Sequence, residues 1–145
     1  MNPMKGGGGC AHEYPFQILE RHLDGFGHVN NAAYLEIFEE ARWDLITRGG
    51  FGLKEVREGM IGPVVLAVEM RFHREATNRE RMVIRTRCLQ YRGKVGRLEQ
   101  TMLRADGLPS CTAVFTFGLF DLRKRRLLQP TPQWLKAVGF DGTER

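Results

Sequence analysis

The sequence lacks the features that mark disulfide-rich, secreted and membrane-spanning proteins. Its three cysteines, Cys10, Cys88 and Cys111, are odd in number and show no paired spacing, which argues against a disulfide framework. No apolar run approaches the roughly 20 residues that a membrane-spanning helix needs, and the first residues contain no apolar core of a signal peptide. The sequence therefore predicts a cytoplasmic protein with no membrane partner.

Motifs for metal ions and for nucleic acids are also missing. The histidines are scattered along the chain, and neither Cys-x-x-Cys nor His-Glu-x-x-His occurs. We therefore expect no metal site. Aromatic residues are not interleaved with the basic clusters as they are on single-strand binding surfaces, so we also expect no nucleic-acid partner.

What the sequence does contain is typical of one globular domain. A chain of 145 residues, 42% hydrophobic and 27% charged, is long enough to bury a core. The run Gly6–Gly9 cannot pack, so we expect a disordered tail over residues 1–12 and a single domain over residues 13–145. The net charge of +5 favours an anionic partner, and coenzyme A is one of the small phosphorylated ligands that fit.

One stretch combines polar residues and glycines directly before the only long helical pattern. It runs from Leu23 to Tyr34 with the sequence LDGFGHVNNAAY. Asn30 or Asn31 is suited to cap a helix, and apolar residues then recur at three- and four-residue steps. We therefore predict a helix from this point to about Arg48, where two glycines end it.

The start of this helix is suited to bind a carbonyl oxygen or an oxyanion. Its first amide N–H groups have no partner within the helix and carry the positive end of the helix dipole. Asp24 lies just upstream, and Gly25 and Gly27 allow a sharp turn and a close approach of a ligand to the backbone. The loop can therefore hold a carboxylate near a row of donors.

The rest of the pattern predicts an α+β fold. Short turns join the later strands, which indicates antiparallel hairpins. Periodicity alone does not distinguish between sheet-on-helix folds. The predicted strands are a first one from Glu13 to about Leu23, then Val64–His73, Met82–Tyr91, Val95–Ala105 and Ser110–Leu122, with a helical turn near Lys54–Glu58 and a short helix within Pro130–Val138 after a Thr131 cap.

The loop and helix carry a family resemblance. The motif Asp-x-x-Gly-His-Val-Asn-Asn-x-x-Tyr, from Asp24 to Tyr34, is followed by Phe-Glu-Glu-Ala-Arg at residues 38–42. This resembles the hotdog-fold acyl-CoA thioesterases of the 4-hydroxybenzoyl-CoA thioesterase type. The resemblance implies a five-stranded antiparallel sheet wrapped around one long central helix, and hydrolysis of an acyl-CoA to free acid and coenzyme A without any further cofactor. It also implies an active site between two subunits, so we expect a homodimer or a homotetramer.

The resemblance assigns roles to individual residues. Asp24 takes the place of the catalytic carboxylate, as nucleophile or as general base, and the backbone N–H of Asn31 takes the place of the group that polarises the thioester carbonyl. Plant acyl-carrier-protein thioesterases share His-Val-Asn-Asn and also use an asparagine and a histidine, which fall on Phe26 and His28. Phe26 departs from that pattern, which leaves His28 as a catalytic helper.

Further residues are assigned to the substrate. Gly27, Val29, Asn30 and Tyr34 are expected to bind the acyl-CoA near the thioester. Arg92 and Lys94, in a predicted turn, are expected to meet the phosphates of coenzyme A, and Arg74 and Arg97 stand at similar strand ends.

Structural roles compete with these assignments. Asp24 can instead tie down a turn, His28 can bond a backbone carbonyl, Tyr34 can face the core, and Glu39 and Arg42 can form an ion pair on the helix.

Two other functions remain open at this point. The first is a hotdog enoyl-CoA hydratase or dehydratase, in which an aspartate and a histidine share proton transfer. Those enzymes have a motif that resembles Asp-x-Asn-x-x-His. In this sequence Phe26 replaces the asparagine, and His28 comes four residues after Asp24. The second is a protein that binds acyl-CoA without turning it over.

Overall fold

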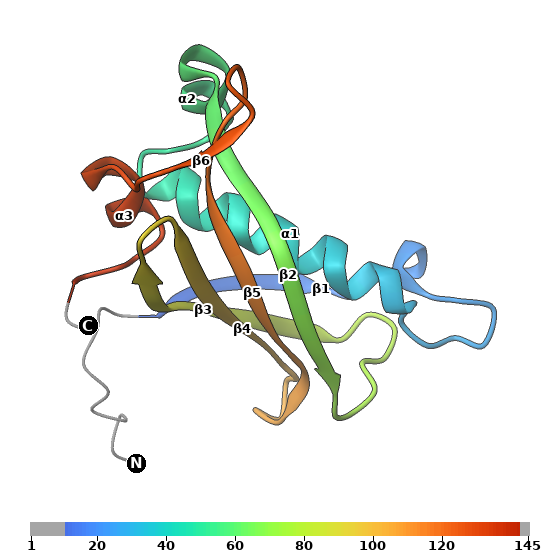
Figure 1. The fold of residues 1–145 in the computed structure, drawn as a ribbon. Coiled ribbons are helices and arrows are strands. Elements are labelled where there is room, and N and C mark those ends of the chain that lie inside the picture. Colours follow the sequence, from blue (N-terminus) through green and yellow to red (C-terminus); the bar gives the residue numbers. More distant parts are fainter. Residues whose placement is uncertain (1–10, 143–145) are drawn as a thin grey trace.

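The structure is a computed structural model that describes residues 11–142. Six strands and three α-helices follow one another, with a short 3-10 helix between the first strand and the first α-helix (Figure 1). The elements are β1 (His12–Gln17), the 3-10 helix (Glu20–His22), α1 (Asn31–Arg48), α2 (Leu53–Gly59), β2 (Ile61–Phe72), β3 (Arg81–Arg92), β4 (Val95–Leu103), β5 (Pro109–Asp121), β6 (Arg126–Leu128) and α3 (Pro132–Ala137).

The strands form one antiparallel sheet that curves around α1, as the α+β prediction requires (Figure 1). The order is β1-β3-β4-β5-β2, and β6 pairs with β5. The five predicted strands are all present. The expectation of five strands was nevertheless one short, because the three residues of β6 are too few to give a period in the sequence.

The buried face of α1 forms the centre of the core. Ala33, Ile37, Phe38 and Ala41 are buried, and the ring of Phe38 lies edge-on to Phe115 of β5 with 6.0 Å between centroids. A second aromatic cluster closes the far end of the helix. Its centre is Trp134 of α3, whose ring packs on Phe51 and Phe117 and whose indole N–H donates to the hydroxyl of Tyr91 at 3.0 Å.

The chain between β1 and α1 differs from the prediction. The first strand ends at Gln17 rather than near Leu23, because the ring Nδ1 of His22 accepts a hydrogen bond from the backbone N–H of Leu19 at 2.9 Å and holds a helical turn. His22 is buried there, and burial lowers the pKa of its ring, which suits a neutral acceptor. The turn redirects the chain toward the Asp24 loop.

The predicted boundary at residue 12 falls inside a strand. His12 belongs to β1, and its ring Nε2 lies 2.8 Å from the carboxylate of Asp44 on α1. The first ten residues of the expected tail lie outside the described residues. The predicted helical turn after α1 and the predicted C-terminal helix are both confirmed, as α2 and α3, and the Thr131 hydroxyl accepts from the N–H of Trp134.

One edge of the sheet is long and apolar. Among the described strands β2 pairs only with β5, so its other side offers unpaired backbone groups. Its exposed side chains include Val65 at 45%, Leu66 at 48%, Val68 at 44% and Phe72 at 54% exposure. Within residues 11–142, no helix is long and apolar enough to cross a membrane.

Candidate active site

The loop before α1 is closed by its own backbone. The N–H of Asp24 donates to the carbonyl of His28 at 2.7 Å, and the N–H of Gly27 donates to the carbonyl of Asp24 at 3.1 Å. Leu23 and Val29 pair as a bridge on either side. Gly27 has φ of +81°, a left-handed conformation that a side chain would strain, whereas Gly25 does not adopt such a conformation. The turn therefore depends on Gly27.

The carboxylate of Asp24 is half-buried and has two unlike oxygen atoms. Oδ1 accepts hydrogen bonds from the backbone N–H groups of Phe26 at 2.9 Å and His28 at 3.2 Å. Oδ2 takes part in no hydrogen bond among the described residues. One oxygen therefore holds the loop, as the turn interpretation predicts, while the other is available to a reactant.

The helix start offers one unused donor next to this loop. Asn30 is the N-cap: its side-chain Oδ1 accepts from the N–H of Ala32 at 2.8 Å, and its carbonyl accepts from the N–H of Ala33 at 2.9 Å. Asn31 is the first helical residue, and its N–H has no acceptor in the part of the chain that the structure describes. This N–H is therefore free to bind a carbonyl oxygen from a ligand.

His28 lies at the surface of the loop and points toward another segment. Its ring Nε2 is 3.5 Å from Oε1 of Glu75 in the β2–β3 connection, and both side chains are more than half exposed. Its backbone groups, rather than its ring, contact Asp24. Sequence reasoning missed Glu75, because nothing near it in the chain links it to the loop.

Two residues assigned to the substrate are buried. Val29 is part of the core, so only its backbone reaches the loop. Tyr34 faces the core with its ring edge-on to Phe72 at 5.2 Å between centroids, and burial raises the pKa of its hydroxyl. The core-facing alternative for Tyr34 is therefore the one that the structure supports.

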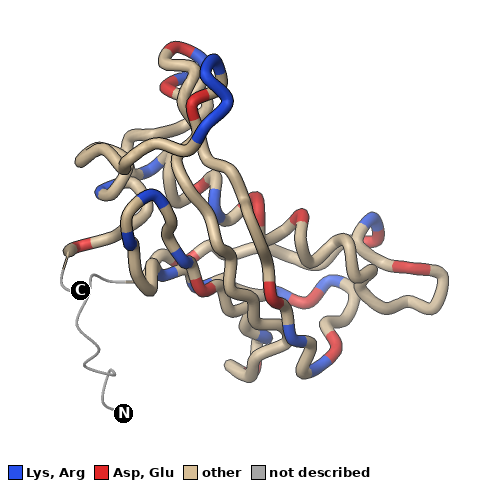
Figure 2. Tube along the Cα trace, in the orientation of Figure 1, with Lys and Arg blue, Asp and Glu red and all other residues tan. Residues whose placement is uncertain are grey.

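The structure does not bring Arg92 and Lys94 to the loop within one chain. Both are exposed in the β3–β4 turn, at the end of the molecule where α3 packs, while the Asp24 loop lies at the opposite end of α1 (Figures 1 and 2). Of the other basic candidates, Arg74 lies at the loop end, where its N–H donates to the carbonyl of Ser110. A longer basic run, Arg123–Arg126, forms the β5–β6 turn beside α2 (Figure 2). Sequence reasoning did not assign this run of four basic residues to coenzyme A, although the run is visible in the sequence.

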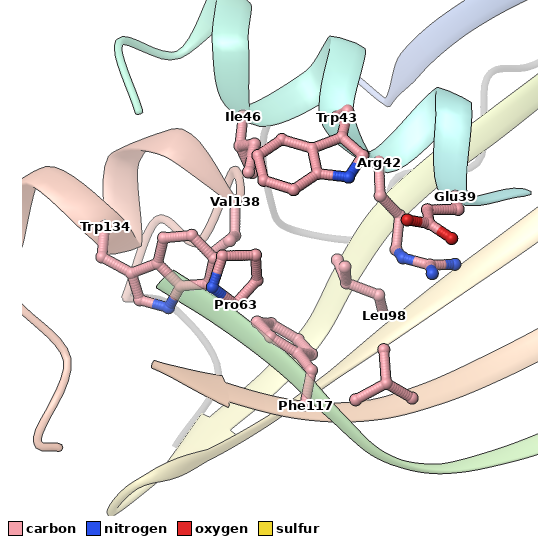
Figure 3. A pocket seen from close by; sticks show the side chains of 10 residues that line it. Glu39, Arg42, Trp43, Ile46, Pro63, Leu98, Phe117, Trp134 and Val138 are labelled. Carbon is pink, nitrogen blue, oxygen red and sulfur yellow. The ribbon is translucent and has the colours of Figure 1, made fainter. Parts of the chain in front are cut away.

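The predicted Glu39–Arg42 ion pair is wrong. Among residues 11–142 the ion pairs do not include Arg42; its Nη1 instead donates to Oε1 of Gln100 at 3.0 Å, and its guanidinium lies 4.0 Å from the ring centroid of Phe115. Arg42 lines a cavity of about 200 Å³ between the second half of α1, the sheet and α3 (Figure 3). Sequence reasoning did not find this cavity.

The loop and the helix start together provide the parts for attack on a carbonyl group. The free Asp24 oxygen can act as nucleophile or as base, and the Asn31 N–H at the positive end of the helix can stabilise negative charge on an oxygen. Among residues 11–142, no three His, Cys, Asp or Glu side chains gather closely enough to hold a metal ion.

Substitution of the two asparagines should have different effects on thermal stability. Asn30→Ala removes the cap acceptor of Ala32 and should lower stability by about 0.5–2 kcal/mol, with a lower Tm in calorimetry. Asn31→Ala is the matched control, because its exposed side chain makes no hydrogen bond among the described residues. Equal losses in both variants would contradict the assignment of Asn30 as the cap.

Comparison with known proteins identifies the family of this chain. The pattern of the thioesterase-like superfamily matches residues 19–139. The long-chain acyl-CoA thioesterase FadM of Escherichia coli strain K12 is 34% identical over 108 residues, which cover 74% of this chain and 81% of the relative.

Solved structures agree as well. A probable thioesterase from Escherichia coli, YbaW, superposes with a TM-score of 0.76 at 28% identity, over 88% of this chain and 96% of the other. A hypothetical protein from Staphylococcus aureus, solved in complex with CoA, has the same fold with a TM-score of 0.83 at 16% identity, over 92% and 85% of the two chains. With the superfamily pattern spanning the site loop, α1 and the sheet, the chain belongs to the thioesterase-like superfamily.

Proposed function

We propose that this protein is an acyl-CoA thioesterase in which Asp24 is the catalytic carboxylate. The observation that carries the proposal is the free Oδ2 of Asp24 in a loop that leads directly to the unused N–H of Asn31. Membership of the thioesterase-like superfamily and the relative FadM support hydrolysis of the thioester bond of an acyl-CoA. The products are a free acid and coenzyme A.

The proposal gives each group a task. The thioester oxygen lies against the Asn31 N–H, where the helix dipole stabilises the negative charge that develops on it. Oδ2 of Asp24 either attacks the carbonyl carbon and displaces coenzyme A as the thiolate, giving a mixed anhydride that water then cleaves, or removes a proton from a water that attacks the carbonyl carbon and displaces the thiolate. Oδ1 remains bonded to the loop in both routes. His28, held toward Glu75, assists from the rim of the site.

The proposal also includes the cofactor requirement of the reaction and the location of the protein. We propose that the reaction needs no cofactor besides the coenzyme A of the substrate, because a carboxylate and backbone donors are sufficient for thioester hydrolysis. A cytoplasmic location is supported by three cysteines without paired spacing.

Release of free thiol from a panel of acyl-CoAs tests the function directly. A thiol reagent reports coenzyme A as it is released, and an enoyl-CoA in the same panel reports hydration by the loss of its conjugated absorbance. A hydratase would give the second signal without the first, and a protein that only binds acyl-CoA would give neither.

Asp24→Asn should lower kcat by at least about 100-fold, the low end of what a positioned general base supplies. Asparagine keeps an oxygen that accepts from Phe26 and His28, so folding should hardly change. Turnover and Tm are measured on one preparation. A lowered Tm with near-normal turnover would instead identify Asp24 as a residue that only ties down the turn.

We propose that the active form is a homodimer, or a tetramer of such dimers, joined through β2. The free edge of β2 and its exposed apolar side chains support this, because pairing of two such edges satisfies backbone groups and removes apolar surface from water. Val68 lies opposite Phe115 in the register, so its side chain is on the inner face of the sheet, at an edge that α1 leaves exposed.

Val68→Lys should convert the dimer to monomers at micromolar concentration, because it places a charge in the apolar contact. Light scattering measures the mass. Glu69→Gln is the matched control, since it makes the same change of charge at the next residue, on the opposite face of the strand. A wild-type protein that is monomeric and active would rule out the dimer.

The dimer also relates the basic turns to the reaction. Phe72 lies beside Tyr34 near the helix start, whereas Ile61 lies at the other end of β2, next to the β5–β6 turn. Antiparallel pairing of β2 with its copy therefore sets the basic end of one subunit against the loop end of its partner. We propose that the phosphates of coenzyme A bind there, to Arg92 and Lys94 or to the run Arg123–Arg126.

Charge reversal should distinguish these two turns. Lys94→Glu or Lys124→Glu should raise KM for an acyl-CoA without lowering kcat, as expected when uniform binding is lost. The control substrate is the same acyl group on pantetheine, which lacks the nucleotide phosphates, and its KM should not change. A turn whose variant leaves both KM values unchanged does not contact coenzyme A.

A further inference from the structure

The cavity beside the second half of α1 has largely apolar walls, one cation and one carboxylate, Glu39. The walls include Trp43 and Ile46 of α1, Leu98 and Phe117 of the sheet, and Trp134 of α3 (Figure 3). Arg42 also lines it and is the cation. Its volume is about 200 Å³. A water molecule occupies about 30 Å³ in the liquid, so the cavity is large enough for several groups of that size.

Arg42 reaches this cavity with most of its donors unused. A guanidinium has five N–H donors, and the hydrogen bond from Nη1 to Gln100 is the only one that Arg42 makes within residues 11–142. None of the carboxylates in that part of the chain forms an ion pair with it, although Glu39 lines the same cavity and its charge favours the charged form of Arg42. Burial lowers the pKa of Arg42 to about 10, so the side chain stays charged at neutral pH.

A cation in this position is costly unless something pairs with it. A partly buried charge loses hydration that one hydrogen bond, one aromatic face and a nearby carboxylate outside ion-pair distance only partly replace. The amide of Gln100 donates to the carbonyl of Phe38 and to the hydroxyl of Thr86, and these bonds hold its oxygen toward Arg42. The guanidinium is therefore fixed in place, and its remaining donors are suited to a planar oxygen acceptor that arrives from outside.

A continuous helix face connects Arg42 with the reaction site. Asn31, Leu35, Glu39 and Arg42 follow one another at steps of three and four residues, which places them on one side of α1. Leu35 and Glu39 are both exposed, so the side between the two ends has one apolar side chain next to the loop and one carboxylate next to the cavity. Arg42 lies roughly 17 Å along the helix from Asn31. The hydrocarbon core of a bilayer is two acyl chains thick and measures about 30 Å, so one such chain spans about 15 Å.

We propose that the cavity binds the far end of the substrate's acyl group, and that Arg42 selects acyl groups ending in a carboxylate. The inference rests on the proposed function, because it assumes a thioester held at Asn31. The apolar walls bind the last methylene groups, and the guanidinium donates two parallel hydrogen bonds to the carboxylate. The substrate class is therefore a long ω-carboxyacyl-CoA.

Hydrolysis of two matched thioesters tests the selection. The wild-type enzyme should cleave ω-carboxydodecanoyl-CoA with a kcat/KM at least about tenfold above that for dodecanoyl-CoA, the lower range for a hydrogen bond to a charged group. Arg42→Met, which keeps the length and loses the charge, should reverse the order. Arg87→Met is the control for charge, because Arg87 is exposed on β3 and does not line the cavity. If the wild-type enzyme cleaves both thioesters equally well, the proposal is wrong, and no variant is needed to show it.

Tryptophan fluorescence tests the cavity independently of catalysis. The chain has two tryptophans, and both line this cavity. Free dodecanoate should change their emission saturably, by placing its carboxylate on Arg42. The apparent Kd should be at least about tenfold weaker in Arg42→Met and unchanged in Arg87→Met. Arg42→Lys, which keeps the charge but loses the planar fork, should fall between the two.

The two measurements separate the possible failures. If neither thioester is hydrolysed but dodecanoate binding depends on Arg42, the proposed function is wrong and the cavity is a carboxylate site. If both thioesters are hydrolysed and Arg42→Met reduces both rates equally, with a lowered Tm, Arg42 only supports Gln100 and the inference is wrong.

Discussion

Burial of one face of α1 against the curved sheet determines the position of every other functional feature. The helix is held along its length by Ala33, Ile37, Phe38 and Ala41, so neither end can shift relative to the strands. Its first turn must then meet the loop that carries Asp24, and its last turns must meet α3, where Gly49 lets the two helices touch. A Cβ at Gly49 would lie 2.5 Å from the Cα of Ala137. The proposed reaction site and the Arg42 cavity therefore lie toward opposite ends of one helix.

The sequence was sufficient for the elements whose signals are local. The cap at Asn30, the glycine pair after Arg48 and the short turns between strands each act within a few residues, and the structure confirms the helix and the antiparallel strands that they predict. The Asp24 loop belongs to the same class. The hydrogen bonds of Asp24 link residues at most four positions apart, so this part of the loop is visible as a motif.

The sequence was not sufficient where the deciding contacts are distant. Arg42 and Glu39 stand at the spacing of a helical ion pair, yet Arg42 turns to Gln100 on β4 because burial of the guanidinium requires an acceptor in the interior. Glu75 meets His28 only because the β2–β3 connection folds over the helix start. His22 ended the first strand early through a bond to Leu19 that competes with the extended conformation. The periodicity of the sequence does not indicate any of these three contacts.

Substitutions at the two ends of α1 should affect different properties of the enzyme. The groups proposed for the reaction come from one loop and one helix start, where Asp24 holds the turn through Oδ1 while its Oδ2 is available to a reactant. The walls at the Arg42 end come from α1, three strands and α3, each contributing one or a few side chains. A single change among them alters the shape or charge of the cavity while the Asp24 loop stays intact. Preference for an acyl group can therefore shift independently of the reaction, and the motif alone predicts the chemistry but not the substrate.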